Sequence, residues 1–463
     1  MWQNREAFIK RQKLLVVFVT ALCALLPVLL NAQWLETTIY IPDSLCGIGL
    51  LRAFTYNPTN NKIYVGGERG NYLIVIDGAT NQKIARIPVG SYTFALCYNA
   101  INNKVYCANY YSDNVTVIDG ATDSVITTIT VGDGPRFLVW NSQNNKVYCT
   151  NWRSNNVTVI DGATNNVITT ITVGSSPFAL IWNSQNNKVY CANFGSNNVT
   201  VIDGAINSVI TTITVGQGPG ALVWNSQNNK VYTANSYTNN VTVIDGVTNS
   251  VIATIPVGNF PGGLVWNSQN NKVYCSSRDH NNVTVIDGTS NSAITTIPVG
   301  NYPCAMVWNA QNNKVYCANQ NSNNVTVING ASNSVITTIP VGDGPWVFCW
   351  NSIQNRVYVA NYYSSSVSVI RDSIVSGIEE NRQPLSVDHL SLEVFPNPAR
   401  SYFNIHTPSN ISRVKIFDVS GNLIISEALT SKTNRISLDG IKQGVYFIQI
   451  DNKMRKEKLI VTK

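Results

Sequence analysis

The chain has 463 residues, of which 44% are hydrophobic and 12% are charged, a composition typical of a folded globular protein and not of a disordered one. Its formal net charge of +7 is uneven, because most of the basic excess lies in residues 1–32 and 392–463. The middle of the chain is nearly neutral, so it lacks the basic surface expected of a protein that binds nucleic-acid phosphates.

Residues 1–32 have the pattern of a cleaved secretory signal peptide. Basic residues between Arg5 and Lys13 precede an apolar run over residues 14–30, and the small residue Ala32 follows. The run is nearly long enough to span a bilayer, so a retained membrane anchor is the alternative. We favour cleavage, because Pro27 interrupts the run and Ala32 suits a cleavage site.

A tyrosine recurs every 42 residues through the middle of the chain, and each copy is the centre of one repeated unit: Tyr64, Tyr106, Tyr148, Tyr190, Tyr232, Tyr274, Tyr316 and Tyr358. A period near 42 with four short strand-like runs is the signature of a β-propeller with one four-stranded blade per repeat. In the unit around Tyr148 we expect strands a to d at residues 137–141, 146–151, 157–160 and 167–173.

Two local features complete the expected blade. The Asp-Gly pair between strands c and d should supply a residue that tolerates positive φ. Trp140 and Tyr148 have the parity for one face of the a–b hairpin, where they would form a cross-strand aromatic pair.

The number of strands predicts how the ring closes. Eight a–b–c sets are present, but only seven are followed by a d strand, and a matching strand stands alone at residues 35–41. The N-terminal strand should therefore complete the last blade and leave few exposed sheet edges. The sequence predicts an all-β, eight-bladed propeller over residues 33–370, with a seven-bladed ring as the alternative.

The repeats have no Gly-His or Trp-Asp pair of the kind found in WD40 blades. They resemble the YVTN family of propeller repeats, in which the second strand reads Tyr-Val-Thr-Asn; the nearest copy here is Tyr358-Val359-Ala360-Asn361. The resemblance covers roughly residues 35–370 and implies an exported or cell-surface propeller. The family's usual number of blades is seven, whereas eight copies are present here.

A polar linker is expected at residues 371–391, followed by a small immunoglobulin-like β-sandwich at residues 392–463. This last segment resembles the type A C-terminal sorting domain of the type IX secretion system. The resemblance rests on Phe395, Pro396, Asn397, Pro398, Gly421, Gly444, Tyr446 and Lys458. It implies that the secretion machinery is a partner and that the protein is released or attached to the outer cell surface after it crosses the periplasm.

Five of the ten cysteines occupy one position in different blades: Cys107, Cys149, Cys191, Cys275 and Cys317. Sheets that face one another lie about 10 Å apart, too far for the roughly 7 Å Cα separation that a disulfide permits. These thiols should be small buried side chains. One bridge, between Cys97 and Cys107 on neighbouring strands, is left open.

No catalytic set is recognisable, and we expect no enzyme activity, cofactor or metal site. Among the three histidines, His280 stands beside Asp279 in a b–c loop, where a solvated surface pair is the ordinary interpretation. The repeated aspartates, such as Asp161, belong to turns. A lactonase-like hydrolase, suggested by fold analogy alone, is the weakest alternative.

The loops between strands b and c and between d and a vary from blade to blade, whereas the other two sets are nearly constant. In a propeller the variable loops share one face, which we call the top face. Aromatic and arginine side chains anchor many interfaces. The candidate ligand-binding residues there are Arg52, Arg69, Tyr92, Tyr110, Tyr111, Arg136, Trp152, Arg153, Trp346, Tyr362 and Tyr363.

These observations favour a monomeric, exported binding scaffold that recognises a glycan, a peptide or a surface protein through the top face. The alternative from a different class is a structural envelope protein whose repeats are a rigid spacer. The competing interpretation of Phe94, Phe178 and Trp346 is that they point into the central channel and fill it.

Overall fold

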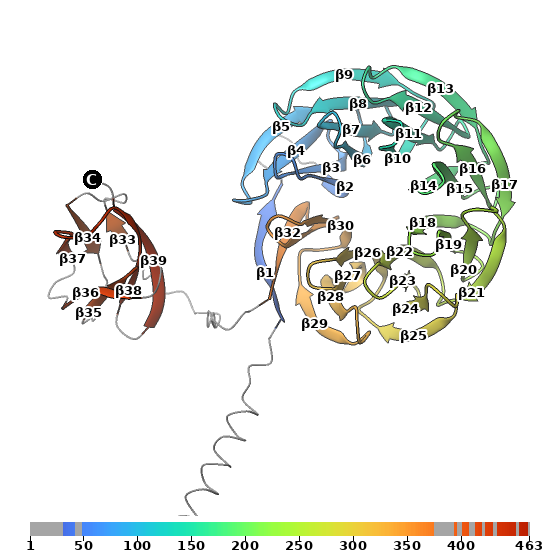
Figure 1. Ribbon diagram of the computed structural model, residues 1–463. Helices are drawn as coiled ribbons and strands as arrows, with labels where there is room; N and C mark the ends of the chain where they lie inside the picture. The colour runs from blue at the N-terminus through green and yellow to red at the C-terminus, as the bar shows by residue number, and fades with distance from the viewer. Residues whose placement is uncertain are drawn as a thin grey trace, which may run out of the picture. The chain divides into compact units, whose positions relative to one another are not determined.

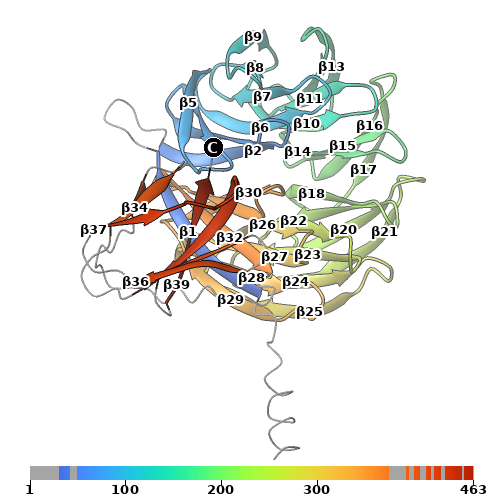
Figure 2. The same ribbon diagram turned by 60° about the vertical axis from the view of Figure 1, so that its left-hand side comes forward.

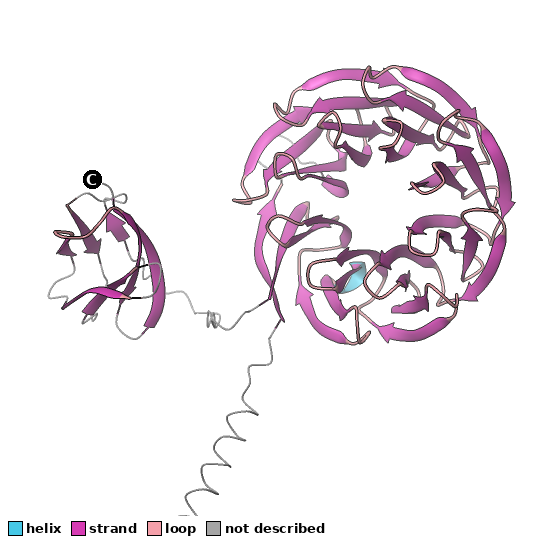
Figure 3. Cartoon of the chain, in the orientation of Figure 1, coloured by secondary structure: helices cyan, strands magenta, loops and turns pink. Residues whose placement is uncertain are grey.

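The computed structural model describes residues 31–41, 49–374, 393–395, 401–406, 413–418, 422–428, 433–450 and 453–461. The chain divides into two compact units, one ending at Ile374 and the other beginning at Val375. Most of the expected signal peptide lies outside the described residues. Within them the structure contains no helix long and apolar enough to cross a membrane. Strands dominate, and the described helix is a single 3-10 turn, η1 (Gln320–Ser322) (Figure 3).

The first unit consists of eight four-stranded sheets within its described residues, which confirms the eight-bladed prediction over the seven-bladed one. Each blade runs a to d from the centre outward. Blade 1 is β2 (Gly49–Asn57), β3 (Lys62–Arg69), β4 (Tyr72–Asp77), β5 (Lys83–Pro88); blade 2 is β6 (Thr93–Asn99), β7 (Lys104–Asn109), β8 (Asn114–Asp119), β9 (Val125–Thr130); blade 3 is β10 (Pro135–Asn141), β11 (Lys146–Asn151), β12 (Asn156–Asp161), β13 (Val167–Thr172); blade 4 is β14 (Pro177–Asn183), β15 (Lys188–Asn193), β16 (Asn198–Asp203), β17 (Val209–Thr214).

The remaining blades follow the same plan. Blade 5 is β18 (Pro219–Asn225), β19 (Lys230–Asn235), β20 (Asn240–Asp245), β21 (Val251–Pro256); blade 6 is β22 (Pro261–Asn267), β23 (Lys272–Ser277), β24 (Asn282–Asp287), β25 (Ala293–Pro298); blade 7 is β26 (Pro303–Asn309), β27 (Lys314–Asn319), β28 (Asn324–Asn329), β29 (Val335–Pro340); blade 8 is β30 (Pro345–Asn351), β31 (Arg356–Asn361), β32 (Ser366–Ile374) and β1 (Asn31–Tyr40). The a strands surround the centre of the ring and the d strands form its circumference (Figures 1 and 2).

The predicted pairing of Trp140 with Tyr148 is wrong. The four-residue connection between β10 and β11 sets Trp140 opposite Val147 and Val139 opposite Tyr148. Since successive residues of a strand face opposite sides, the two aromatic rings lie on opposite faces of the blade. Trp140 packs toward blade 2, whereas Tyr148 is fully buried against Leu180 and Val189 of blade 4.

Two side chains of strand b connect each of blades 1 to 6 to the next blade by hydrogen bonds. The Lys104 ammonium donates to the carbonyl oxygens of Gly162 (2.9 Å) and Ala163 (3.0 Å), and Tyr106 donates to the Gly162 oxygen at 3.3 Å. These carbonyls belong to the c–d turn of the following blade. Desolvation lowers the pKa of Lys104 and, as the leading cause, raises the pKa of Tyr106. These contacts between blades explain why the c–d loops, which lie on the face opposite the top face, are nearly constant in sequence.

The c–d turn also corrects the expected role of its glycine. The left-handed residue in the turn of blade 3 is Asn165, at φ 64°, and not Gly162. Gly162 is needed for close packing, because a Cβ there would lie 2.6 Å from the backbone oxygen of Asn145.

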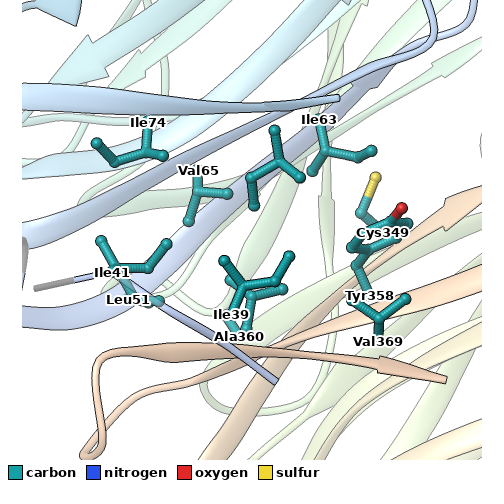
Figure 4. Packing of buried hydrophobic residues seen from close by; sticks show 12 residues of the cluster. Ile39, Ile41, Leu51, Ile63, Val65, Ile74, Cys349, Tyr358, Ala360 and Val369 are labelled. Atoms are coloured by element: carbon teal, nitrogen blue, oxygen red, sulfur yellow. The ribbon is translucent and has the colours of Figure 1, made fainter. Parts of the chain in front are cut away.

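The N-terminal strand closes the ring as the sequence predicts. β1 pairs antiparallel with β32, so that Thr38 lies opposite Ser368 and Ile39 opposite Val367. β32 extends to Ile374, beyond the predicted end of the propeller at residue 370. Figure 4 shows the hydrophobic cluster at this closure, where Ile39 and Ile41 pack among buried residues of blades 1 and 8.

At the ring closure, an arginine that also forms an ion pair replaces the lysine found in the other blades. Arg356 replaces the repeated lysine in blade 8, and it donates to the oxygens of Gly78 (2.7 Å) and Ala79 (2.8 Å) in blade 1. The same guanidinium binds Glu36 of β1 through Nε (2.7 Å) and Nη2 (2.6 Å). One arginine therefore ties β1 to both sides of the closure.

The Cys97–Cys107 bridge does not form, since both thiols are free. The register places Cys97 opposite Tyr106 and Leu96 opposite Cys107, so the two side chains face opposite sides of blade 2. Burial raises the pKa of each thiol to about 12. The equivalent cysteines of the other blades are free as well, as predicted.

The second unit is a small two-sheet β domain. One sheet has the order β33 (Glu393–Phe395), β34 (Tyr402–His406), β37 (Thr433–Ser437), and the other β36 (Leu423–Ala428), β35 (Arg413–Phe417), β38 (Gly444–Ile450), β39 (Lys453–Val461). Phe403 and Ile436 from the first sheet share a buried core with Ile416 and Ile448 from the second. This is the sandwich arrangement that the sequence predicts.

Candidate functional site

The variable loops lie together, because the b–c and d–a loops of neighbouring repeats are hydrogen-bonded. The Tyr110 nitrogen donates to the Tyr92 oxygen at 2.9 Å, and the Trp152 nitrogen to the Gly134 oxygen at 2.9 Å. The same bond recurs around the ring to Tyr362 and Gly344, at 2.7 Å. The top face therefore rests on a regular hydrogen-bonded frame that holds its side chains in place.

In blade 2 the top face carries a cluster of rings. Tyr92 contacts Tyr111 at 4.7 Å between centroids, and Tyr110 contacts both Phe94 (5.6 Å) and Tyr111 (5.2 Å). The Arg153 guanidinium lies 5.0 Å from the centre of the Tyr110 ring. The pKa of Arg153 is raised, first by charge interaction with Tyr110 and then by Asp133, which lies 3.5 Å away.

Arg136 links this cluster to blade 4. Its guanidinium carbon lies 4.3 Å from the ring centre of Phe94, 4.5 Å from Trp152 and 3.9 Å from Phe178. Such cation–π contacts each contribute roughly 0.5–2 kcal/mol, the more so where water is excluded. Arg136 is therefore held by three rings from three blades.

The rings continue around the face beyond the candidate residues of blades 2 and 3. Phe194 contacts Trp152 (5.9 Å), Phe178 (5.5 Å) and Tyr237 (5.4 Å). Tyr237 in turn contacts Phe260 at 5.9 Å. The ring contacts therefore extend from the candidate residues of blades 2 and 3 through blades 4, 5 and 6.

A second arginine continues the series. The Arg278 guanidinium carbon lies 5.6 Å from the ring centre of Phe260, 5.5 Å from Tyr302 and 5.5 Å from Trp346. Trp346 contacts Tyr362 at 5.8 Å, which contacts Tyr363 at 5.2 Å. We call the whole set the aromatic belt: Tyr92, Phe94, Tyr110, Tyr111, Trp152, Phe178, Phe194, Tyr237, Phe260, Tyr302, Trp346, Tyr362 and Tyr363.

Blade 1 contributes little to the belt. Its Glu68 carboxylate accepts a hydrogen bond from the Tyr362 hydroxyl at 2.9 Å, and Arg69 is exposed. The side chain of Arg52 lies outside the described residues. The predicted site residues of blades 2, 3 and 8 are therefore brought together, whereas Arg69 joins none of the belt's described ring contacts.

The candidate site residues differ in how much of their surface is exposed. Tyr111 and Tyr363 expose 57% and 62% of their surface. Trp152 and Arg136 are half-buried, because neighbouring rings pack against them. Trp152 is therefore both a possible ligand contact and a packing residue.

Three belt residues have an unusual backbone. Tyr92, Phe260 and Tyr302 have φ of 63°, 54° and 57°, in the left-handed region. At the same position of the repeat, blades 3, 5 and 8 have Gly134, Gly218 and Gly344, which adopt this conformation without a side chain. Bulky residues rarely occupy this region, and such strain is concentrated at functional sites.

The central channel opens to the top face and contains a cavity of about 330 Å³. Phe94, Arg136, Phe178, Arg278 and Trp346 are among the residues that line it. The alternative interpretation is thus right that these rings point into the channel, but they leave space between them. A second hollow of about 420 Å³ is lined by Tyr302, Gln320, Asn321, Trp346, Tyr362 and Tyr363.

His280 has a structural partner. Its Nδ1 accepts a hydrogen bond from the Asn259 nitrogen at 3.1 Å. At the equivalent position of the next repeat, the Ser322 hydroxyl accepts a hydrogen bond from the Asn301 nitrogen. Within the described part of the chain, no group of three or more His, Cys, Asp or Glu residues could hold a metal ion.

Sequence comparison finds a matching family model for part of each unit. Residues 124–315 match the family model of YNCE-like β-propellers, and residues 393–462 match that of the secretion system C-terminal sorting domain. The protein is therefore an exported propeller with a type IX sorting domain, and it reaches the cell surface or is secreted. Of the predicted sorting residues, Gly444 and Tyr446 lie in β38, Lys458 in β39 and Phe395 in β33. Pro396, Asn397, Pro398 and Gly421 lie outside the described residues.

Solved structures with a similar fold include a chain of hydrazine synthase from Kuenenia stuttgartiensis, which is 18% identical with a TM-score of 0.52 over 72% of this chain and 98% of that one. Sqt1 from Saccharomyces cerevisiae is 10% identical, with a TM-score of 0.63 over 71% of this chain and 97% of that one. At these identities the likeness shows the fold alone. No protein with a curated description matches the sequence.

Sequence reasoning missed Arg278, Tyr237, Phe260 and Tyr302 as site residues. The missing signal was available by aligning the repeats. Phe260 and Tyr302 stand at the position of Tyr92 and of three glycines, and Arg278 stands at the position of Tyr110 and Trp152. Where other copies of the repeat have glycine, a large side chain is not required by the fold.

Proposed function

We propose that the protein is an exported binding scaffold that recognises an extracellular ligand through the aromatic belt. The observation that carries the proposal is the left-handed conformation of Tyr92, Phe260 and Tyr302. This conformation costs roughly 1–2 kcal/mol for a residue with a side chain, and the same repeat position tolerates glycine elsewhere. A spacer without a ligand would gain nothing from these rings.

The composition of the belt supports a binding role. Tyr111, Tyr237 and Tyr363 expose 57%, 58% and 62% of their surface. Tyr and Trp offer a flat apolar face together with a polar group, which suits recognition of glycans, peptides and protein surfaces. We propose binding and not catalysis, because nucleophile, base and orienting group are not found together in the described residues of the belt.

The test measures binding of Tyr92→Gly and Tyr302→Gly variants to whole cells, extracted surface glycans and a glycan array. We expect at least tenfold weaker binding, since each ring is lost, while thermal stability changes little, since strain is relieved. The matched control is Val247→Ala, because Val247 is 64% exposed in a c–d turn on the opposite face. Unchanged binding by both glycine variants would favour the spacer interpretation instead.

A further inference from the structure

We propose that the mouth of the central channel binds an acidic sugar, with Arg278 and Arg136 contacting its oxyanion and the aromatic belt contacting the rest of the saccharide. This inference rests on the proposed function, since it assigns the ligand class of the same face. It is carried by the asymmetry of the channel lining, the setting of Arg278 and the charge of the cavity.

The channel is asymmetric because one position of strand a varies in size. The second residue of this strand is Phe94, Arg136, Phe178 and Trp346 in blades 2, 3, 4 and 8. Blades 5, 6 and 7 have Gly220, Gly262 and Cys304 at the same position. The small residues leave one side of the channel open, and the cavity of about 330 Å³ extends across it to the large residues opposite.

Arg278 occupies the space that Gly262 leaves. A Cβ at position 262 would lie 2.6 Å from Arg278 Nε, so the arginine requires this glycine. Arg278 Nε is buried, and it has no hydrogen-bond partner among the described residues. Rings of Phe260, Tyr302 and Trp346 surround the guanidinium at 5.5–5.6 Å. A buried N–H without an acceptor is costly. Because Nε is covered by the backbone at Gly262, we propose that an oxyanion in the cavity pairs with the rest of the guanidinium, which lines the cavity.

The charged side chains that the structure describes in the cavity lining are positive. Arg136 and Arg278 are the charged residues among those described that line it. Inside a narrow channel with apolar walls their field is weakly screened, so anions are attracted into it. The planar fork of a guanidinium matches a carboxylate or a sulfate through paired hydrogen bonds. The shared ligand chemistry is therefore an oxyanion.

Four observations favour a saccharide as the carrier of that oxyanion. The belt offers flat aromatic faces with phenolic hydroxyls at its rim, which match the apolar faces and hydroxyl edges of sugar rings. The d strands, with their free edges, lie on the circumference and not on the top face, so a peptide could not add there as a strand (Figure 1). The nearly neutral repeats lack the basic track that a nucleic acid requires. The cavity is near the lower end of ligand-site volumes, roughly 300–1,000 Å³, and suits one sugar unit.

The experiment titrates the protein that begins at residue 33 with two acidic saccharides, oligogalacturonate and a sulfated oligogalactan. The methyl ester of oligogalacturonate is the neutral control. An acidic pentapeptide of glutamates and a single-stranded oligonucleotide test the other carriers. We expect at least one acidic saccharide to bind tenfold or more tightly than the ester, with affinity that falls as salt is added. No binding of either acidic saccharide at millimolar concentration, equal binding of the ester, or tighter binding of the peptide or oligonucleotide would overturn the proposal.

Arg278→Gln and Arg136→Gln then locate the site. Each should weaken binding of the acidic saccharide by about 10- to 100-fold, the range expected for a hydrogen bond to a charged group. The matched control is Arg86→Gln, because Arg86 lies 3.8 Å from the Tyr72 ring centre on the outer strand, away from the channel. Thermal unfolding verifies that each variant is folded. If Tyr302→Gly weakens binding and both glutamine variants bind normally, recognition by the belt stands and the oxyanion site is wrong.

Discussion

Asp372 and Lys314 form an ion pair at 2.6 Å in which both side chains are almost completely buried, with 0% and 1% of their surface exposed. In blades 1 to 6 the corresponding lysine binds carbonyl oxygens of the next c–d turn, as Lys104 does with Gly162. Blade 8 has no such turn, because its fourth strand comes from the N-terminus. The Asp372 carboxylate takes the place of the missing carbonyls, and it also accepts a hydrogen bond from Asn309 at 2.6 Å.

Asp372→Ala should destabilise the ring strongly. The change leaves the Lys314 ammonium buried without its anion, and breaking such a pair costs about 3–5 kcal/mol. Burial already lowers the pKa of Lys314, and the carboxylate opposes this effect. Urea unfolding monitored by tryptophan fluorescence would give the difference in free energy of unfolding.

The control is Asp133→Ala, whose carboxylate lies 3.5 Å from Arg153 with both side chains about half exposed. An exposed pair contributes no more than about 1 kcal/mol. Equal losses from the two substitutions would contradict the closure role of Asp372.

The turn aspartates predict an acid-dependent loss of stability. In four of these turns the pKa of the aspartate is lowered, chiefly by a hydrogen bond from the backbone nitrogen three residues later. The pairs are Asp119 with Thr122, Asp161 with Thr164, Asp245 with Thr248 and Asp287 with Ser290. A carboxylate whose pKa is depressed by folding stabilises above its unfolded value, about 3.9. This contribution is lost as pH falls below roughly 4 and passes through the folded pKa.

The chain contains its own neutral control for this effect. In blade 7 the turn begins with Asn329, whose side-chain oxygen accepts the same bonds from Ala331 (2.9 Å) and Ser332 (3.0 Å). Replacing Asp119, Asp161, Asp245 and Asp287 by Asn should therefore keep the fold and flatten the decrease in melting temperature between about pH 5 and pH 2. Calorimetry at several pH values measures this. An acid dependence as steep as that of the wild type would show that other groups cause it.

The architecture could be predicted because the same repeat unit occurs eight times in the sequence. The period fixes the blades, and the unmatched strand at residues 35–41 fixes the closure with β32. The pairing of Trp140 with Tyr148 failed because a shift of one residue in hairpin register reverses the face, and loop composition did not determine that register. Alignment of the repeats marks Tyr92 and Arg278 as unusual at their positions, but the packing of Arg278 against Gly262 is local geometry that the repeat pattern does not contain.

The sorting domain should be separable from the propeller. Its core around Phe403 and Ile416 is its own, and the ring closes without it. Deleting residues 392–463 should leave a folded propeller in the periplasm, because the match to the sorting domain spans residues 393–462. Cell fractionation with immunoblotting measures the distribution. Normal release of the truncated protein into the medium would remove the sorting role from this segment.

The last prediction separates ligand contacts from packing within the blades by three single substitutions. Tyr111→Ala should change the free energy of unfolding by only about 0.5–1 kcal/mol, since Tyr111 is 57% exposed and its ring contacts with Tyr92 and Tyr110 lie at the surface. Trp152→Ala should cost about 1–3 kcal/mol, because it removes ring contacts with Phe178 (5.7 Å) and Phe194 (5.9 Å), each worth roughly 0.5–1.5 kcal/mol.

Tyr148→Ala should cost the most, about 3–5 kcal/mol, because it leaves a cavity between blades 3 and 4 and removes a hydrogen bond to Gly204. Binding should follow a different order, in which Tyr111→Ala weakens ligand binding with little loss of stability. Denaturant unfolding and whole-cell binding are measured on the same three preparations. A stability loss for Tyr111→Ala as large as that for Trp152→Ala would mean that the exposed rings of the belt serve packing, and the recognition surface would then have to lie elsewhere.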